Sequence, residues 1–229
     1  MNAETPVKVE AEDLYYGVHK GIRLANARML VRLGSVDPTD EKALAETLKA
    51  LEQHLEMSLS HLVHENHQIH TALESRCPGA THDAGDDHEH HEESFVELRR
   101  LAAEVAGAGA DRPKRLRRLY QRFALFVADD LAHMHEEETK LMPLIEANFT
   151  PEEIVGIRER IVADIEPDMM VRFMRAMLAA ATETERREMV GGMQAGMPTE
   201  VFSGMMTAVS GAPWVPGDWA GLGRALAAA

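Results

Sequence analysis

The chain has 229 residues, 45% hydrophobic and 27% charged, which is the composition of a folding globular protein and excludes wholesale disorder. The formal net charge of −14, with histidine neutral, disfavours nucleic acid and anionic membrane surfaces as partners. A lone cysteine, Cys77, a polar start without a signal or anchor pattern, and no apolar run near the roughly 18 residues of a membrane helix predict a cytoplasmic protein.

Helical periodicity recurs along the chain and period-two alternation is scarce, which predicts an all-α fold. Gly, Pro and short polar stretches separate the first four helices. We expect these helices over residues 9–33, 39–74, 86–105 and 113–148, with a loop over 77–85. Long helices with short connections predict an antiparallel, up-down-up-down four-helix bundle over residues 1–149.

A shorter all-helical extension is predicted over residues 150–229. It opens on Thr150, Pro151 and Glu153, which combine a capping residue, a proline at the first helical position and a glutamate at the third. The expected helices cover 151–165, 168–181, 184–193, 199–209 and 218–226. Nine of the fourteen methionines lie in this extension. Because methionine suits adaptable interfaces, the extension is expected to pack against the bundle or to form a homodimer interface.

Histidine is concentrated in one part of the chain. Eleven of the twelve histidines lie between His54 and His135, and the other is His19. In the fourth predicted helix an inward stripe follows the three- and four-residue spacing of one helix face. Its members are Leu116, Leu119, Phe123, Phe126, Asp130, His133, Glu137, Lys140 and Leu144. Burying these charged groups would be costly unless something bound them, and a metal ion is the expected partner.

The other three predicted helices also carry histidine or glutamate on or beside their inward faces. His61 and Glu65 are four residues apart beside the apolar line of the second helix, as His133 and Glu137 are in the fourth. In the third helix His88 and His91 fall on the inward face, and Glu92 lies one turn beyond His88. His19 is in line with apolar residues of the first helix. The remaining histidines are expected at the surface, namely His54, His64, His67, His70, His82, His90 and His135.

The order of these motifs resembles the hemerythrin-like family. They read His19, His61-Leu-Val-His-Glu65, His88-Glu-His-His91 and His133-Met-His-Glu-Glu137, and Leu141-Met-Pro-Leu144 is similar to the family's continuation after the last motif. The resemblance covers residues 9–148. It implies a four-helix bundle around two iron ions with an oxo or hydroxo bridge.

The resemblance also implies ligand roles. Glu65 and Glu137 would bridge the irons, and the terminal ligands would be His19, His61, His88 and His133. Manganese would use the same oxygen and imidazole ligands. Asp130 is a candidate acceptor for the second N–H of a ligand imidazole.

Two departures from the family's oxygen carriers leave alternatives open. The carriers have His-x-x-x-His in the third helix, whereas either His91 or Glu92 would have to complete the site here. They also have an aspartate five residues after the last histidine, where this chain has Glu138, so Glu137 and Glu138 compete for the bridge. A carboxylate in the third helix would favour redox or peroxide chemistry over oxygen carriage.

The function that the resemblance implies is that of a di-iron protein acting on O2, NO or H2O2 as a sensor, store or scavenger. A di-iron enzyme with peroxidase-like, catalase-like or NO-reducing activity would use the same centre with electrons from a partner. An iron-responsive interaction module, whose extension presents a partner surface, is the third alternative.

Overall fold

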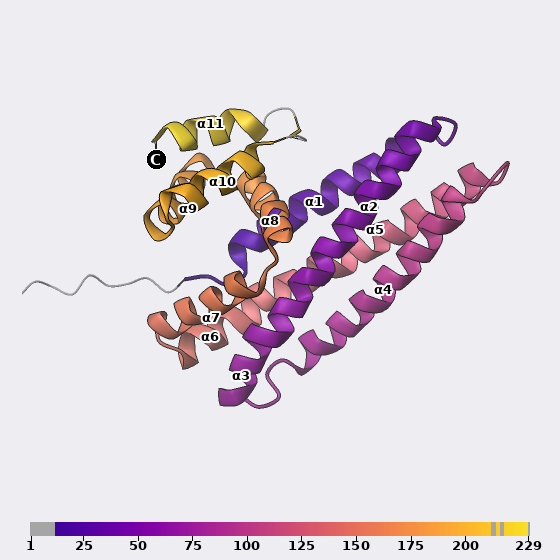
Figure 1. The fold of residues 1–229 in the computed structure, drawn as a ribbon. Helices are drawn as coiled ribbons and strands as arrows, with labels where there is room; N and C mark the ends of the chain where they lie inside the picture. The colour runs from indigo at the N-terminus through magenta and orange to yellow at the C-terminus, as the bar shows by residue number, and fades with distance from the viewer. Residues whose placement is uncertain (1–11, 212–213, 216–217, 229) are drawn as a thin grey trace, which may run out of the picture.

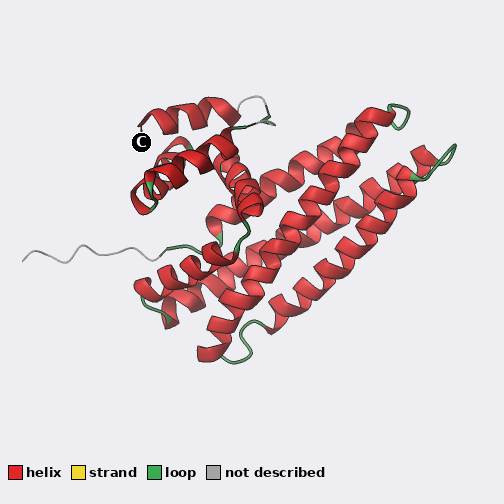
Figure 2. Cartoon of the chain, viewed as in Figure 1, coloured by secondary structure: helices red, strands yellow, loops and turns green. Residues whose placement is uncertain are grey.

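The computed structural model describes residues 12–211, 214–215 and 218–228. Every regular element in these ranges is a helix, and no strand occurs in them (Figure 2). The predicted all-α class is therefore confirmed. Four long helices lie side by side (Figure 1). They are α1 (Tyr16–Ser35), α2 (Glu41–His64), α4 (His82–Ala106) and α5 (Arg112–Glu136).

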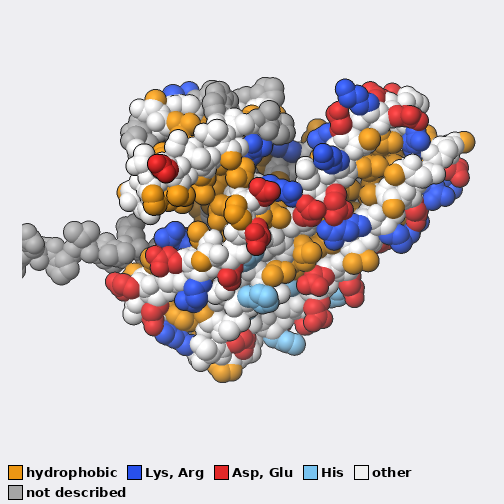
Figure 3. All heavy atoms as spheres, viewed as in Figure 1, with side chains coloured by type: hydrophobic (Ala, Val, Ile, Leu, Met, Phe, Trp, Pro, Cys, Tyr) orange, Lys and Arg blue, Asp and Glu red, His pale blue; other side chains and the backbone are white. Residues whose placement is uncertain are grey.

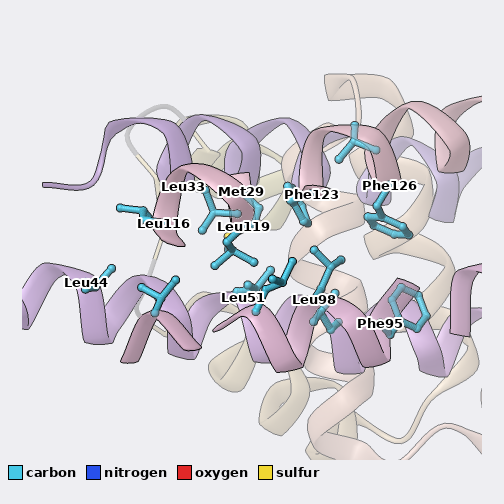
Figure 4. Close-up of a cluster of buried hydrophobic side chains, with 14 of the residues drawn as sticks. Met29, Leu33, Leu44, Leu51, Phe95, Leu98, Leu116, Leu119, Phe123 and Phe126 are labelled. Atoms are coloured by element: carbon cyan, nitrogen blue, oxygen red, sulfur yellow. The ribbon is translucent and has the colours of Figure 1, made fainter. Parts of the chain in front are cut away.

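One hydrophobic core joins the four long helices. Both α1 and α4 pack against α2 and α5. The inward side chains recur every three or four residues, the spacing that places them on one side of a helix. Leu33, Leu51, Leu98, Leu119 and Phe123 are among the fully buried members (Figure 4). This core fills the half of the helices near the α1–α2 and α4–α5 connections, and the inward histidines and glutamates lie beyond it.

Two long helices each contain a widened turn of π-helix. The first, η1 (Glu65–His70), separates α2 from α3 (Thr71–Arg76), and the second, η2 (Glu137–Leu141), separates α5 from α6 (Met142–Asn148). A π-helical turn accommodates one extra residue, so it changes the face on which later residues lie. The predicted inward stripe is therefore wrong beyond Glu137. Lys140 and Leu144 are exposed, and Leu141 and Ile145 take their places in the interior.

The turn between α3 and α4 is shorter than predicted. The carboxylate of Glu74 accepts hydrogen bonds from the backbone N–H groups of Gly79 and Thr81 and from the Thr81 hydroxyl. These bonds lower the pKa of Glu74 to about 2. Gly79 has a φ of 85°, a conformation that favours glycine. Because this tight turn already reverses the chain, α4 begins at His82 rather than at residue 86.

Helix α1 begins at Tyr16, later than the predicted start at Val9. Residues 9–11 of the predicted helix lie outside the described residues. Asp13 accepts hydrogen bonds from the backbone N–H groups of Tyr15 and Tyr16. An acceptor at this place satisfies N–H groups that have no partner within the helix, which explains the start of α1.

In the part of the chain that the structure describes, five further helices follow α6. They are α7 (Pro151–Asp164), α8 (Pro167–Ala180), α9 (Glu183–Gly196), α10 (Thr199–Ser210) and α11 (Asp218–Ala228). Capping boxes begin α7 at Thr150 and α9 at Thr182, the first as predicted. Helices α8 to α11 have a small core of their own that includes Leu178, Val190 and Leu222. None of the described helices is both long and apolar enough to cross a membrane.

Helix α8 lies directly against α1 (Figure 1). A Cβ atom on Gly21 of α1 would be only 2.9 Å from the backbone nitrogen of Met177, so the absence of a side chain permits this approach. Ion pairs also tie the C-terminal helices to the long helices, including Lys20 with Glu185 and Arg172 with Glu56. The C-terminal helices therefore cover one side of α1, beside the inward histidines.

Candidate metal centre

Seven buried or nearly buried polar side chains meet between the long helices. Helix α1 supplies His19, α2 supplies His61, α4 supplies His88 and α5 supplies His133. The two π-helical turns supply Glu65, His70 and Glu137. The structure thus brings together six of the eight predicted ligands and adds His70.

The first group of potential ligands is His19, His61 and Glu65. The Nε2 atom of His61 lies 3.1 Å from Oε1 of Glu65, since the two residues are one helical turn apart. The Nε2 atom of His19 lies 3.4 Å from the same oxygen. It is also 3.4 Å from Oε2 of Glu137, which connects this group to the second one.

The second group contains Glu65, His88, His133 and Glu137. The Nε2 atoms of His88 and His133 are 2.9 Å apart, and Nε2 of His133 lies 3.3 Å from Oε2 of Glu137. The Nε2 atom of His88 is 3.6 Å from Glu65 and 3.7 Å from Glu137. Glu65 is shared by the two groups, and Glu137 approaches residues of both. This is the arrangement that two neighbouring cations with common carboxylates would require.

Most of the atoms that face this cluster lack hydrogen-bond partners, the exceptions being the Nε2 atoms of His88 and His133, which contact each other. Among the described residues, the atoms without a partner are both carboxylate oxygens of Glu65 and of Glu137 and the Nε2 atoms of His19, His61 and His70. Leaving one buried polar atom unpaired costs on the order of 1–3 kcal/mol, and more for a charged group. Metal ions would satisfy all of these atoms at once. Imidazole nitrogen and carboxylate oxygen suit iron, manganese or zinc, and no thiolate is present because Cys77 lies outside the cluster.

The charges in the cluster are strongly coupled. Burial alone would lower the pKa of His133, but Glu137 raises it to about 9. Burial also opposes ionisation of Glu137, yet the surrounding imidazoles hold its pKa well below the usual value. His61 behaves differently, because burial lowers its pKa to about 4. Without metal, the carboxylates therefore stay ionised and draw protons onto His19 and His133. Metal ions must displace these protons, so metal binding is expected to weaken as the pH falls.

Three polar side chains orient the imidazoles from outside the cluster. Nδ1 of His88 lies 2.7 Å from Oδ1 of Asn66, and Nδ1 of His133 lies 3.3 Å from Asp87. Nδ1 of His19 lies 3.0 Å from Glu138. Such contacts leave the Nε2 atoms free to face a metal. Asp130, the acceptor predicted for a ligand imidazole, instead accepts a hydrogen bond from Asn26.

Glu137 and Glu138 have different environments. Glu137 is fully buried among the histidines, whereas Glu138 lies at the edge, where Arg23 donates two hydrogen bonds to its carboxylate. A helix turns by about 100° per residue, so adjacent residues cannot both face the same point. The geometry favours Glu137 as the ligand and Glu138 as the residue that orients His19.

This difference gives a graded prediction. Glu138→Gln is expected to weaken metal binding by about 10–100-fold without abolishing it, since it loosens His19 but leaves every ligand in place. A competition titration against a chelator of known affinity measures the change. Glu136→Gln is the matched control, because the Glu136 side chain is 47% exposed, pairs with Lys140 and belongs to neither ligand group. Complete loss of metal from the Glu138 variant would show that Glu138 is itself a ligand.

His91 and Glu92 are not brought into either group. His91 is buried, but its ring packs against the rings of Phe126 and His133, and burial lowers its pKa to about 3. Glu92 is exposed. The regular turn of α4 accounts for this, because His88 and His91 lie on the buried side and the next residue turns away from it. The fifth imidazole near the centre comes from His70.

His70 was expected at the surface, and this expectation is wrong. It is buried, its ring stacks on His88 with centroids 5.0 Å apart, and its Nε2 lies 3.8 Å from Oε1 of Glu137. In a regular helix, the fifth residue after Glu65 would lie well off the face of that glutamate. The extra residue in the π-helical turn η1 places His70 on the same face as Glu65. The prediction from sequence periodicity requires an unbroken α-helix. Because η1 interrupts the α-helix before His70, the prediction did not include this residue.

His54 is also buried, against expectation. Its Nε2–H donates to Oδ1 of Asn26, and the Asn26 amide donates to Asp130. Burial lowers the pKa of His54 from 6.5 to about 4 and raises the pKa of Asp130 from 3.8 to about 6. As the pH falls, the unfolded chain protonates at His54 before the folded one does, which destabilises the fold. Protonation of Asp130 in the folded chain has the opposite effect.

The contribution of His54 can be isolated. His54→Gln retains a donor for Asn26 and cannot be protonated. Between pH 7.5 and 4, its free energy of unfolding is expected to rise by about 3 kcal/mol relative to that of the unsubstituted chain. Urea unfolding of the metal-free proteins measures this difference. His90→Gln is the control, since His90 is exposed. Parallel pH profiles for the unsubstituted chain and His54→Gln would contradict the assignment.

Tyr15 borders the cluster as well. It is fully buried, its ring lies 5.3 Å from that of His19, and its hydroxyl lacks a hydrogen-bond partner among the described residues. Burial raises the pKa of Tyr15 well above 10, with the charges of Glu137 and Glu65 acting in the same direction. Tyr15 is therefore a neutral hydrogen-bond donor beside the two carboxylates.

Comparisons of the chain with protein-family models, with curated proteins and with solved structures find no match. The site is thus defined by its own geometry. The fold and the site together define an all-helical protein with a buried histidine and glutamate cluster that can bind metal, and this is compatible with a hemerythrin-like fold.

Proposed function

We propose that the chain is a hemerythrin-like protein in which an antiparallel four-helix bundle holds two iron ions, and that it binds or reacts with O2, NO or H2O2. The observation that best supports this is the convergence of buried imidazole and carboxylate atoms, most of them without a hydrogen-bond partner, on two groups that share Glu65. Manganese would find the same ligands. Zinc is less well served, because it favours four ligands of its own rather than shared carboxylates.

In this proposal Glu65 and Glu137 are shared by the ions. His19 and His61 would hold one ion, and His88 and His133 would hold the other together with His70. The site formed by His19 and His61 would thus offer fewer imidazoles than the site formed by His70, His88 and His133. His61 and Glu65 also line a cavity between the long helices and the C-terminal helices, which would give a small molecule access to the first of these sites.

Bound iron would supply redox chemistry and an open coordination position for a small ligand. The chain's own residues would prepare that position. Tyr15 offers an unpaired buried hydroxyl as a hydrogen-bond donor, Glu138 and Arg23 fix the orientation of His19, and the apolar core excludes water from the far side. Such a site suits a sensor, store or scavenger of a small oxidant or diatomic gas.

The test is the visible absorption spectrum of protein loaded with ferrous iron without oxygen. Exposure to O2, NO or H2O2 is expected to produce a new absorption band, and for the O2 or H2O2 product this band should bleach on reduction. Iron-loaded protein whose spectrum responds to none of the three would overturn the functional proposal and leave the metal site standing. Consumption of many equivalents of H2O2 or NO per chain, with a reductant present, would identify an enzyme rather than a binding protein.

A further inference from the structure

A cavity of about 780 Å³ lies between the long helices and the C-terminal helices. Residues of α1, α2, η1, α7, α8, α9 and α10 line it. Figure 3 shows apolar side chains gathered where the C-terminal helices face the long ones. Pockets for organic molecules of drug size have volumes of about 300–1,000 Å³, so the cavity is far larger than a diatomic gas requires.

The floor of the cavity is apolar and rich in methionine. The buried lining includes Ile69, Phe173 and Met174. Of the described residues, seven methionines line the cavity, and six of them lie on α8, α9 and α10. Methionine is flexible and polarisable, and it adapts to ligands of irregular shape. This floor suits the body of an apolar organic molecule.

The rim of the cavity is acidic. Among the described residues, the two Lys and Arg side chains at the rim are already in ion pairs, Lys20 with Glu185 and Arg158 with Glu12, each at 2.7 Å. Within the described part of the chain, the rim residues Asp13, Glu159 and Glu188 have no cationic partner. An anionic molecule entering the cavity would meet this negative rim, whereas a cationic group would be attracted to it.

We propose that this cavity binds an apolar organic cation, with the apolar body on the methionine-rich floor and an amine group at the acidic rim. The far end of such a molecule would lie near His61 and Glu65, which line the same cavity. The inference goes beyond the proposed function and does not rest on it, because the floor and the rim are complete without metal.

Three amphiphiles with one chain length and different head groups test the proposal. Binding of dodecylamine, dodecanol and dodecanoate to the full chain is measured by calorimetry at pH 7, below the concentrations at which they aggregate. Metal-free protein is used first, so that dodecanoate gains nothing by coordinating a metal, and metal content is measured in parallel. The amine is expected to bind tightest and the carboxylate weakest, with a difference of about tenfold, because the rim carboxylates attract the one head group and repel the other.

Glycines on α9 provide a matched pair of variants. Gly192 lines the cavity and Gly191 does not, and nothing lies within 4 Å of a Cβ atom built on either. Gly192→Leu is expected to lower the affinity for dodecylamine at least tenfold, whereas Gly191→Leu should leave it unchanged. Both changes raise helix propensity, so lost binding would not come from unfolding. The double variant Glu159→Gln/Glu188→Gln should lower the affinity for dodecylamine severalfold and leave the affinity for dodecanol unchanged.

The proposal is overturned if dodecanoate binds metal-free protein as tightly as dodecylamine, if dodecylamine does not bind, or if both glycine variants lose binding equally. A chain that binds dodecylamine in this order but takes up no iron would retain the cavity proposal and refute the proposed function. A chain that takes up iron and binds none of the amphiphiles would refute the cavity proposal and leave the proposed function standing.

Discussion

Glu137→Gln is expected to abolish binding of at least one of the two proposed metal ions and to lower the affinity for the other by more than about 100-fold, which exceeds the usual effect of a residue outside the ligand set. Glu137 has no exposure to solvent, and its two oxygens lie 3.3–3.8 Å from nitrogens of His19, His70, His88 and His133. An amide has almost the same shape but neither the charge nor the second acceptor. Elemental analysis after reconstitution and gel filtration measures the change.

The neighbouring glutamates make this test specific. Glu136→Gln should bind metal as the unsubstituted chain does, and Glu138→Gln should show the intermediate effect described above. Far-UV circular dichroism checks that each variant retains its helices. A Glu137→Gln protein that binds two ions with undiminished affinity would refute the role of Glu137 and, with it, the shared-carboxylate arrangement.

Removal of the metal is expected to lower the stability of the protein substantially. At a free metal concentration of 100 times Kd, each bound ion stabilises the fold by about 2.7 kcal/mol, so two ions give about 5 kcal/mol. For a chain of this length, that corresponds to a fall in Tm on the order of 10–20 °C. The physical reason is that, without metal, the cluster leaves two carboxylates and several imidazoles buried and incompletely paired. Thermal unfolding with and without a chelator measures the difference.

The loss of stability on metal removal should depend on pH and on the side chains that bind the metal. Lower pH favours protons over metal at His19 and His133, so the difference between the two forms should shrink as the pH falls from 8 to 6. The Glu137→Gln variant should be nearly insensitive to the chelator. Equal melting temperatures with and without chelator, in a protein shown to contain two ions beforehand, would contradict this account of the cluster.

Periodicity predicted the helices well where they are regular. The inward faces of α1, of α4 and of α5 as far as Glu137 follow from residues three or four apart, and the line from Tyr15 through His19 to Leu33 is buried as expected. The two π-helical turns could not be predicted in this way, because no residue type in the sequence signals that a turn contains one extra residue. Leu144 was placed inside on this assumption and is 38% exposed, whereas Ile145 is 1% exposed.

The same limit explains which parts of the site were predicted. His61 with Glu65 and His133 with Glu137 are each one regular turn apart and precede the extra residue, so their convergence was accessible from spacing alone. His70 follows the extra residue in η1 and was missed. The choice between Glu137 and Glu138 required the register of α5, and the burial of His54 required its partner Asn26 on another helix. Contacts between helices are not encoded in the periodicity of either one.

The metal content of the full chain tests the proposed di-iron centre most directly. The protein is reconstituted with ferrous iron under anaerobic conditions, freed of loose metal by gel filtration and assayed for iron, manganese and zinc. We expect about two iron ions per unsubstituted chain, fewer than one in Glu137→Gln and two in Glu136→Gln. A chain that retains no metal after reconstitution, while its helical content is unchanged, would contradict this expectation.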